Sequence, residues 1–381
     1  MSSTPQVYLD TASAERLHPA ARDTLLAALE RGYADPRRLH GPGRDARLLL
    51  DNARAVVAEC LGMRADEVGF TASGTDAVHR GLLGLLSPAG GGSVVSSAVE
   101  HSAVLQALSW HGSGHGSGHG SGAHVRVPVD HTGRVDETAL AQAARRPGVA
   151  AVALQAANQE VGTLQPVDEV DLPEDVPLLV DAAAAVGRVR LPQRWDVLTA
   201  SARKWGGPAG VGVLAVRRGT RWSPALPGDE GLDGLDAASV DVPGALAAAA
   251  ALQAVLAERA EVAARQFRLV ERIRAAALDL GDTEVVGDPV QRLPHLVTFS
   301  CLYVAGDEIV TELARRGFAV ASGSACTAST LEPSHVLAAM GALTHGNVRV
   351  SLERDTTEEQ VEAFCRALRE AVTDIRRRAG L

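Results

Sequence analysis

Short apolar runs alternate with polar or helix-like segments along the first half of the chain, and this alternation most constrains the fold. The runs are VGFT (68–71), SVVSS (93–97), VRVPV (125–129), VAAVALQ (149–155), PLLVDAA (177–183), DVLTAS (196–201) and GVLAV (212–216). Strands that alternate with helices build a mostly parallel sheet with helices on both faces. The sequence therefore predicts an α/β fold with a doubly wound sheet.

Two stretches show apolar residues at helical spacing. Residues 18–62 are expected to be helical, with Gly62 as a stop, and residues 239–281 are expected to form one long helix. Asp241 can cap the long helix, and Gly281 is placed to end it. Such a helix is suited to link two parts of a protein.

The length of the chain predicts two domains, because 381 residues exceed the usual size of a single hydrophobic core. Residues 285–381 show short strand-like and helix-like runs, which is an α+β pattern. We expect a large domain over residues 15–245 and a smaller C-terminal α+β domain over 246–381, which also takes in residues 1–14.

Charge and cysteine spacing restrict the partners and the compartment. The net charge is −9 with no basic block, which argues against nucleic acid and acidic membranes as main partners. The start MSSTPQVYLD has no secretory signal pattern, and no run approaches the roughly 18 apolar residues of a membrane span. The four cysteines lack CxxC spacing, which favours free thiols over disulfides or zinc. We expect a cytoplasmic protein without a metal site.

A four-residue repeat, HGSGHGSGHGSG, occupies residues 111–122. Its histidines allow a metal-site interpretation, whereas its glycine and serine content is typical of a solvated, flexible loop. The loop interpretation is favoured, because a flexible tract offers no fixed coordination geometry.

Polar side chains follow several of the predicted strands. They are Glu100, His101, Asn158, Asp181 and residues 201–204. In doubly wound sheets, binding and chemistry gather at the carboxyl ends of the strands. A small-residue turn, SGT (73–75), also joins VGFT to a helix, and such a turn can bind a phosphate through backbone N–H groups, although many similar turns bind nothing.

Lys204 stands out because it is the sole lysine among the 37 lysine and arginine residues of the chain. Arginine stays protonated, whereas a lysine can lose its proton and form a Schiff base. Lys204 is therefore a candidate for imine chemistry, with the survival of one surface lysine as the alternative.

A longer stretch, AVASGSACTASTLEPSHVLAAMG (319–341), carries the most specific motif of the chain. It resembles the catalytic-cysteine loop of the cysteine desulfurases in the class V aminotransferase group, in the branch with the longer, mobile loop. The resemblance extends from YLDTAS (8–13) to RVSL (349–352). It implies a fold-type I enzyme dependent on pyridoxal 5'-phosphate (PLP), with a large domain and a smaller C-terminal domain.

The resemblance implies a set of residues that bind PLP. Lys204 matches the Schiff-base lysine, Asp181 the carboxylate that pairs with the pyridinium nitrogen, and His101 the imidazole that stacks on the ring and relays protons. Gly74 and Thr75 match the phosphate cradle, to which Ser201 would add a hydroxyl.

Three further residues are implied in substrate chemistry. Asn158 matches the amide near the PLP hydroxyl and the substrate carboxylate, and Arg349 matches the arginine that grips that carboxylate. Cys326 matches the nucleophile that takes sulfur from cysteine as a persulfide on a mobile loop. The remaining cysteines are predicted to be packing residues: Cys60, Cys301 and Cys365.

The chain departs from the family pattern at three places. Arg203 stands where a histidine usually precedes the lysine, and it can hold the phosphate in its place. Ala184 replaces a glutamine that touches the PLP hydroxyl. The segment 226–244 lacks the family's arginine, but Ser239 aligns with the hydroxyl residue that reaches the phosphate of the partner subunit.

The implied function is conversion of L-cysteine to L-alanine with sulfur carried on Cys326. The implied assembly is a homodimer that passes sulfur to an acceptor, which leaves iron–sulfur assembly, tRNA thiolation and natural-product thiolation open. Two alternatives stay open: another PLP enzyme of the same fold, such as an aminotransferase, lyase or epimerase, and a weakly catalytic scaffold for sulfur-trafficking partners. Retained Lys204 and Asp181 argue against the scaffold.

Overall fold

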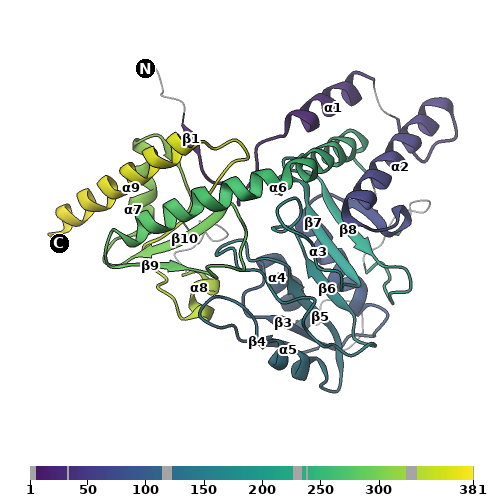
Figure 1. The fold of residues 1–381 in the computed structure, drawn as a ribbon. Helices are drawn as coiled ribbons and strands as arrows, with labels where there is room; N and C mark the ends of the chain where they lie inside the picture. The colour runs from purple at the N-terminus through teal and green to yellow at the C-terminus, as the bar shows by residue number, and fades with distance from the viewer. Residues whose placement is uncertain are drawn as a thin grey trace.

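The central feature of the computed structural model is a seven-stranded sheet (Figure 1). The structure describes residues 6–31, 34–113, 122–225, 234–236, 239–322 and 333–380. In sheet order, the strands are β2 (Val68–Thr71), β8 (Gly212–Val216), β7 (Val197–Ser201), β6 (Leu178–Asp181), β5 (Val149–Gln155), β3 (Ser93–Ser97) and β4 (His124–Val127). All pairs are parallel except those of β8, which runs antiparallel to both neighbours. The predicted mostly parallel α/β sheet is confirmed.

Helices cover both faces of this sheet, because successive strand residues point to opposite sides. In β6, Leu179 packs in one hydrophobic cluster with residues of α3 (Gly74–Leu86) and α4 (Ser102–Gly112). Its neighbours Leu178 and Val180 pack in another cluster, with residues of α2 (Gly41–Leu61), α5 (Glu137–Ala144) and α6 (Val242–Leu278). These strands are buried on both faces, which explains their continuous apolar runs.

The long helix α6 connects the large sheet to a second core (Figure 1). Leu252 belongs to the cluster under the large sheet, whereas Leu269 and Ile273 belong to a separate cluster. The second core contains the antiparallel sheet β12 (Asn347–Ser351), β10 (Leu296–Cys301) and β9 (Thr283–Val286), and the helices α7 (Gly306–Arg315) and α9 (Glu358–Ala379). The short α8 (His335–Met340) packs in a fourth cluster.

The N-terminal strand joins the second core, not the first. Strand β1 (Val7–Tyr8) pairs in parallel with β11 (Phe318–Ala319), and Leu9 is buried in the second cluster. The packing of β1 and Leu9 supports the proposed division, in which residues 1–14 accompany the C-terminal part, whereas Ala12 packs in the cluster under the large sheet. The division itself remains our proposal.

Two helix boundaries differ from the sequence prediction. Residues 18–62 form two helices, α1 (Pro19–Glu30) and α2, because each start is capped by a histidine whose Nδ1 accepts a backbone N–H: His18 for α1 and His40 for α2. Helix α6 ends at Leu278, before Gly281, whose positive φ of 66° places it in the turn that follows. Gly62 ends α2 as expected, with φ 71°.

Two further sequence features can be located in part. Residues 114–121 of the HGSG repeat lie outside the described residues, while the ring of His111 is hydrogen-bonded to the carbonyl of Gly92 at 3.1 Å. Within the described part of the chain, none of the helices has the length and apolar character needed to cross a bilayer.

Candidate active site

A cavity opens at the carboxyl ends of the central strands. Most of the predicted polar residues line it: Gly74, Thr75, His101, Asp181, Ser201, Arg203 and Lys204. They meet there because β6 and β7 are parallel neighbours, which brings Asp181 and the Ser201–Lys204 turn to one edge of the sheet. Ala184, the predicted departure, also lines this cavity.

The first wall of the cavity is an anion cradle at the start of α3. The hydroxyl of Ser73 caps this helix by accepting the N–H of Asp76 at 3.1 Å. The N–H groups of the first helical turn point out of the helix end, together with the positive end of its dipole. A Cβ on Gly74 would lie 2.6 Å from Cβ of Ser201, so this position has room for backbone but not for a side chain. The cradle fits a phosphate held by backbone groups.

Asp181 and His101 form the second wall. Asp181 is buried, and its Oδ1 accepts the N–H of Ala183 at 3.0 Å, which fixes the carboxylate at the end of β6. His101 caps α4 through Nδ1, which accepts the N–H of Ala103 at 3.1 Å. Burial lowers the pKa of His101 against the opposing charge of Asp181, and the charges of Lys204 and Arg203 act in the same direction as burial. The imidazole is therefore neutral at pH 7 and carries its proton on Nε2.

Lys204 lies between the cavity and the N-terminal segment. It ends a short helical turn (Ala202–Lys204) that follows β7 directly. Its Nζ donates hydrogen bonds to the carbonyl oxygens of Ala12 and Ser13, the latter at 3.1 Å. Two backbone acceptors thus hold the amine at the edge of the cavity.

Asn158 braces a turn in the structure. Its Oδ1 accepts the N–H groups of Glu160 at 2.8 Å and Val161 at 2.9 Å, and its Nδ2 donates to the carbonyl of Val99 at 3.0 Å. These hydrogen bonds fix the turn, and the next residue, Gln159, lines the cavity. The predicted contact of Asn158 with PLP and substrate remains a prediction.

Arg349 is buried on β12 in a dense hydrogen-bond network. Its Nη2 donates to Oδ1 of Asp10 at 2.9 Å and to Oγ of Ser13 at 2.6 Å, and its Nη1 donates to the carbonyl of Gln159 at 3.1 Å. The guanidinium is therefore linked to the turn that also binds Lys204 and to a residue that lines the cavity.

The other predicted residues lie in different settings. Ser239 is exposed in this single chain, and its predicted contact with a partner subunit is untested. Cys326 lies outside the described residues. Cys301 is buried in the second core, and Cys60 and Cys365 pack at core edges; burial raises the pKa of all three thiols, which fits a packing role.

Sequence reasoning missed two glutamines and gave no role to a buried carboxyl group. Gln155 and Gln159 line the cavity, and Nε2 of Gln159 is buried without a hydrogen-bond partner among the described residues. Glu100 is fully buried, with Oε1 accepting the hydroxyl of Ser97 at 2.5 Å and the N–H of Gln155 at 3.1 Å. Burial raises its pKa to about 8. The one available signal was the position of Glu100 after a strand.

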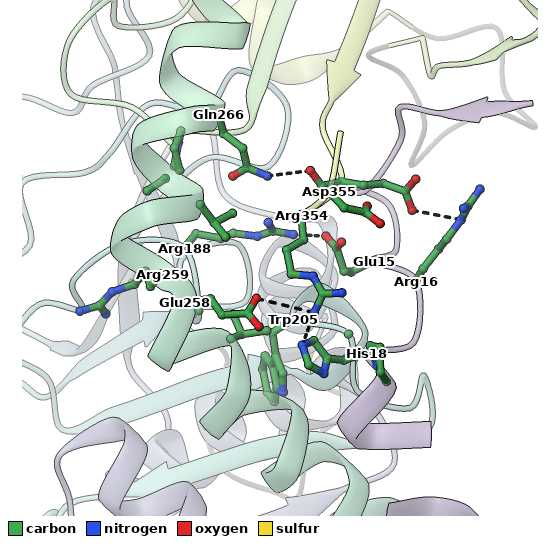
Figure 2. Close-up of a pocket in the computed structure, with 18 of the residues that line it drawn as sticks. Glu15, Arg16, His18, Arg188, Trp205, Glu258, Arg259, Gln266, Arg354 and Asp355 are labelled. Atoms are coloured by element: carbon green, nitrogen blue, oxygen red, sulfur yellow. Dashed lines mark hydrogen bonds and ion pairs between the residues drawn. The ribbon is translucent and has the colours of Figure 1, made fainter. Parts of the chain in front are cut away.

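A second cavity lies between α6, residues 15–19 and residues 353–355 (Figure 2). Paired charges dominate its walls: Arg188 contacts Glu15, Arg16 lies 3.0 Å from Glu353, and Arg354 lies 3.6 Å from Glu258. The first two pairs attach the N-terminal segment to both cores. The cavity shares no lining residue with the one at the strand ends.

A single lysine amine, a buried carboxylate and a helix-start anion cradle at one sheet edge define a site of the PLP-enzyme type. Comparisons with known proteins agree. The family model described as Aminotransferase class-V matches residues 7–364. A cysteine desulfurase of Cereibacter sphaeroides is 36% identical, with 97% of each chain covered. The cysteine desulfurase NifS of Azotobacter vinelandii is 34% identical, with 97% of this chain and 93% of that protein covered.

Solved structures extend the agreement to the fold. One described as a NifS-like protein superposes with a TM-score of 0.88 at 27% identity, covering 97% of this chain and 100% of its own. The chain belongs to the class V aminotransferase family. Membership implies PLP as the cofactor, and the described cradle, carboxylate and amine fit that group.

The cradle predicts that Gly74→Ala weakens PLP binding by about tenfold or more, since the new Cβ would push against Ser201 where the phosphate must approach the backbone. Titration of the apoprotein with PLP, followed by absorbance, measures the affinity. The matched control is Gly41→Ala at the start of α2, where a Cβ meets nothing within 4 Å. Equal PLP affinity in the two variants would contradict the assigned cradle.

The raised pKa of Glu100 predicts that the stability of the fold depends on pH. Its pKa is about 8 in the folded protein against an ordinary value of 4.5 in the unfolded chain, so the folded state holds the extra proton between these values. Stability from this group is present at low pH and is lost as pH rises toward 8. We therefore expect the free energy of unfolding of Glu100→Gln minus that of wild type, both measured with urea, to increase from pH 5 to about 8. Glu174→Gln, at an exposed position, is the control. A Glu100→Gln curve that runs parallel to that of wild type would refute the assignment.

Proposed function

We propose that this protein is a PLP-dependent cysteine desulfurase, which converts L-cysteine to L-alanine and takes the sulfur onto Cys326. The supporting observation is the meeting of Lys204, Asp181, His101 and the α3 cradle in one cavity, within a chain whose relatives are named cysteine desulfurases. When bound, PLP supplies an electron sink that stabilises negative charge on the substrate carbon.

The cavity residues would bind the cofactor and move protons. The α3 start and Ser201 would hold the phosphate, with Arg203 beside them in the cavity wall. Asp181 would hold a proton at the pyridine nitrogen, because a buried carboxylate favours a neighbouring positive charge. Nζ of Lys204 would take and return the proton of the substrate Cα, and Nε2–H of His101 would serve as a proton donor at the face of the site.

Arg349 would bind the α-carboxylate of L-cysteine. A guanidinium suits this task because it can make two parallel hydrogen bonds to one carboxylate. Its bond to the carbonyl of Gln159, which lines the cavity, supports an approach from that side. Asn158 would contribute by fixing the turn that carries Gln159.

Cys326 would receive the sulfur. The Cys326 thiolate would attack the sulfur of cysteine and form an S–S bond, while the Cβ–S bond breaks and leaves its electron pair with Cβ. Cβ would then take up a proton, which completes alanine and leaves the sulfur on Cys326 as a persulfide. Described residues on either side of this segment contact residues of the site, which supports the proposal: Ala321 pairs with the backbone of Arg349, and the hydroxyl of Ser334 donates to Glu160 at 2.6 Å. A sulfur-acceptor protein, in iron–sulfur assembly or tRNA thiolation, would then take the persulfide sulfur.

The reaction predicts equal amounts of sulfide and alanine from PLP-loaded protein given L-cysteine and a reductant. Cys326→Ala should lose sulfide formation while it retains PLP. Lys204→Arg keeps the positive charge but removes the titratable amine, so both products should fall by about a hundredfold or more. Sulfide and alanine are quantified together. A wild type that binds PLP but makes neither product, or a fully active Cys326→Ala, would overturn the proposal.

A homodimer would complete the site, with Ser239 reaching the phosphate of the partner subunit. Exposed leucines on and before α1 and α2 support a covered face there: Leu17, Leu26, Leu29, Leu39 and Leu48. Light scattering should give twice the 39.6 kDa chain mass. Ser239→Ala should weaken PLP binding without changing that mass, and a monomer with full PLP affinity would exclude the shared site.

A further inference from the structure

Arg349 carries a carboxylate partner from its own chain. Its side chain is 3% exposed, and the carboxylate of Asp10 lies 2.9 Å from Nη2. The hydroxyl of Ser13 takes a second hydrogen bond from the same nitrogen at 2.6 Å and donates to Oδ1 of Asp10 at 2.9 Å. Both hydrogens of Nη2 are therefore in use.

The neighbouring donor of the same guanidinium is not satisfied. Nε of Arg349 is buried and has no hydrogen-bond partner among the described residues. Nε–H and one hydrogen of Nη2 lie on the same edge of the guanidinium, which is an edge that binds carboxylates through two parallel bonds. Asp10 is bonded to Nη2 of this guanidinium and not to Nε, so one of the two nitrogens of a two-point carboxylate site has no partner among the described residues.

We propose that Asp10 competes with the substrate carboxylate for Arg349. In the substrate-free enzyme Asp10 is hydrogen-bonded to Nη2 of Arg349, and it leaves this nitrogen when the α-carboxylate binds across Nε and Nη2. The inference rests on the proposed function and adds to it a residue that sets substrate affinity. A substrate carboxylate would satisfy both nitrogens at once, whereas Asp10 is bonded to one of them.

The exposure of Asp10 makes this exchange physically reasonable. Its side chain is 22% exposed, so a displaced carboxylate can be hydrated, whereas Arg349 is enclosed and needs a carboxylate or an equivalent acceptor at all times. The backbone around Asp10 is fixed independently of this pair. Ser351 N–H donates to the carbonyl of Leu9, and Ala12 N–H donates to Oγ of Ser351. Release of the Asp10 side chain therefore does not require the turn to leave its place.

The same turn contacts the reactive lysine. The carbonyl of Ser13 accepts a hydrogen bond from Nζ of Lys204, and the hydroxyl of Ser13 accepts one from Nη2 of Arg349. One short turn therefore holds both groups that would meet the amino acid substrate, the amine at one side and the guanidinium at the other.

The test measures binding of carboxylate and non-carboxylate ligands to the PLP-loaded enzyme by calorimetry. The probes are 3-mercaptopropionate, which has the thiol and carboxylate of cysteine without the amine, and cysteamine, which has the thiol and amine without the carboxylate. Asp10→Asn should bind 3-mercaptopropionate about fivefold more tightly than wild type, because a neutral amide competes less well than a carboxylate for the guanidinium. Its affinity for cysteamine should not change.

The controls separate this role from a structural one. Asp374 lies on α9 and forms an ion pair with Arg316. The variant Asp374→Asn removes this ion pair and should bind both probes like wild type. Asp10→Ala removes the acceptor altogether and should tighten 3-mercaptopropionate binding at least as much as Asp10→Asn. Weaker binding in both Asp10 variants would show that Asp10 positions Arg349, and unchanged binding would show that it does not compete. Either result overturns the proposal.

This readout is separate from the proposed activity. Sulfide and alanine formation report whether the enzyme is a desulfurase, whereas 3-mercaptopropionate binding reports the competition at Arg349 even in an enzyme that releases no sulfide. Circular dichroism and the PLP absorbance of each variant verify that the fold and the cofactor site are intact.

Discussion

The hydrogen bonds from Nζ of Lys204 to the carbonyls of Ala12 and Ser13 are the contacts on which the site depends. They join a lysine that follows β7 of the large sheet to the N-terminal segment, whose Leu9 packs in the second core and whose Ala12 packs in the first. Because Ser13 also accepts a hydrogen bond from Arg349, three residues that are distant in sequence meet at one turn. The proposed action of this amine and this guanidinium on one amino acid therefore requires that the two cores keep their relative position.

The position of this turn is fixed from both sides. Glu15 N–H donates to the carbonyl of Arg203 at 2.8 Å, and His18 N–H donates to the carbonyl of Gly206 at 2.8 Å, so the segment follows the lysine turn closely. Arg188 contacts Glu15 (Figure 2). It also donates to the carbonyl of Lys204 at 3.4 Å. The charged cavity beside α6 is thus part of the scaffold that holds Lys204.

Local patterns in the sequence predicted the elements with short-range causes. Continuous apolar runs marked the strands buried on both faces, and Asp241 was recognised as the cap of α6, where its Oδ1 accepts Gly244 N–H at 3.0 Å. The break between α1 and α2 was missed because histidine is an unusual capping residue. The pairing of Asp10 with Arg349 could not be predicted, because it depends on how β1 and β12 meet in space. The raised pKa of Glu100 likewise results from burial, which spacing does not reveal.

We propose that Lys204 holds the cofactor, and because the chain has a single lysine, this proposal can be tested directly. The side-chain amine of Lys204 is the sole lysine amine, so borohydride reduction of the PLP-loaded protein should fix the cofactor there or at the N-terminal amine. We predict about one phosphopyridoxyl group per chain, located by mass spectrometry on the peptide that contains Lys204. A cofactor-loaded protein whose Lys204 peptide remains unmodified after reduction would contradict the account.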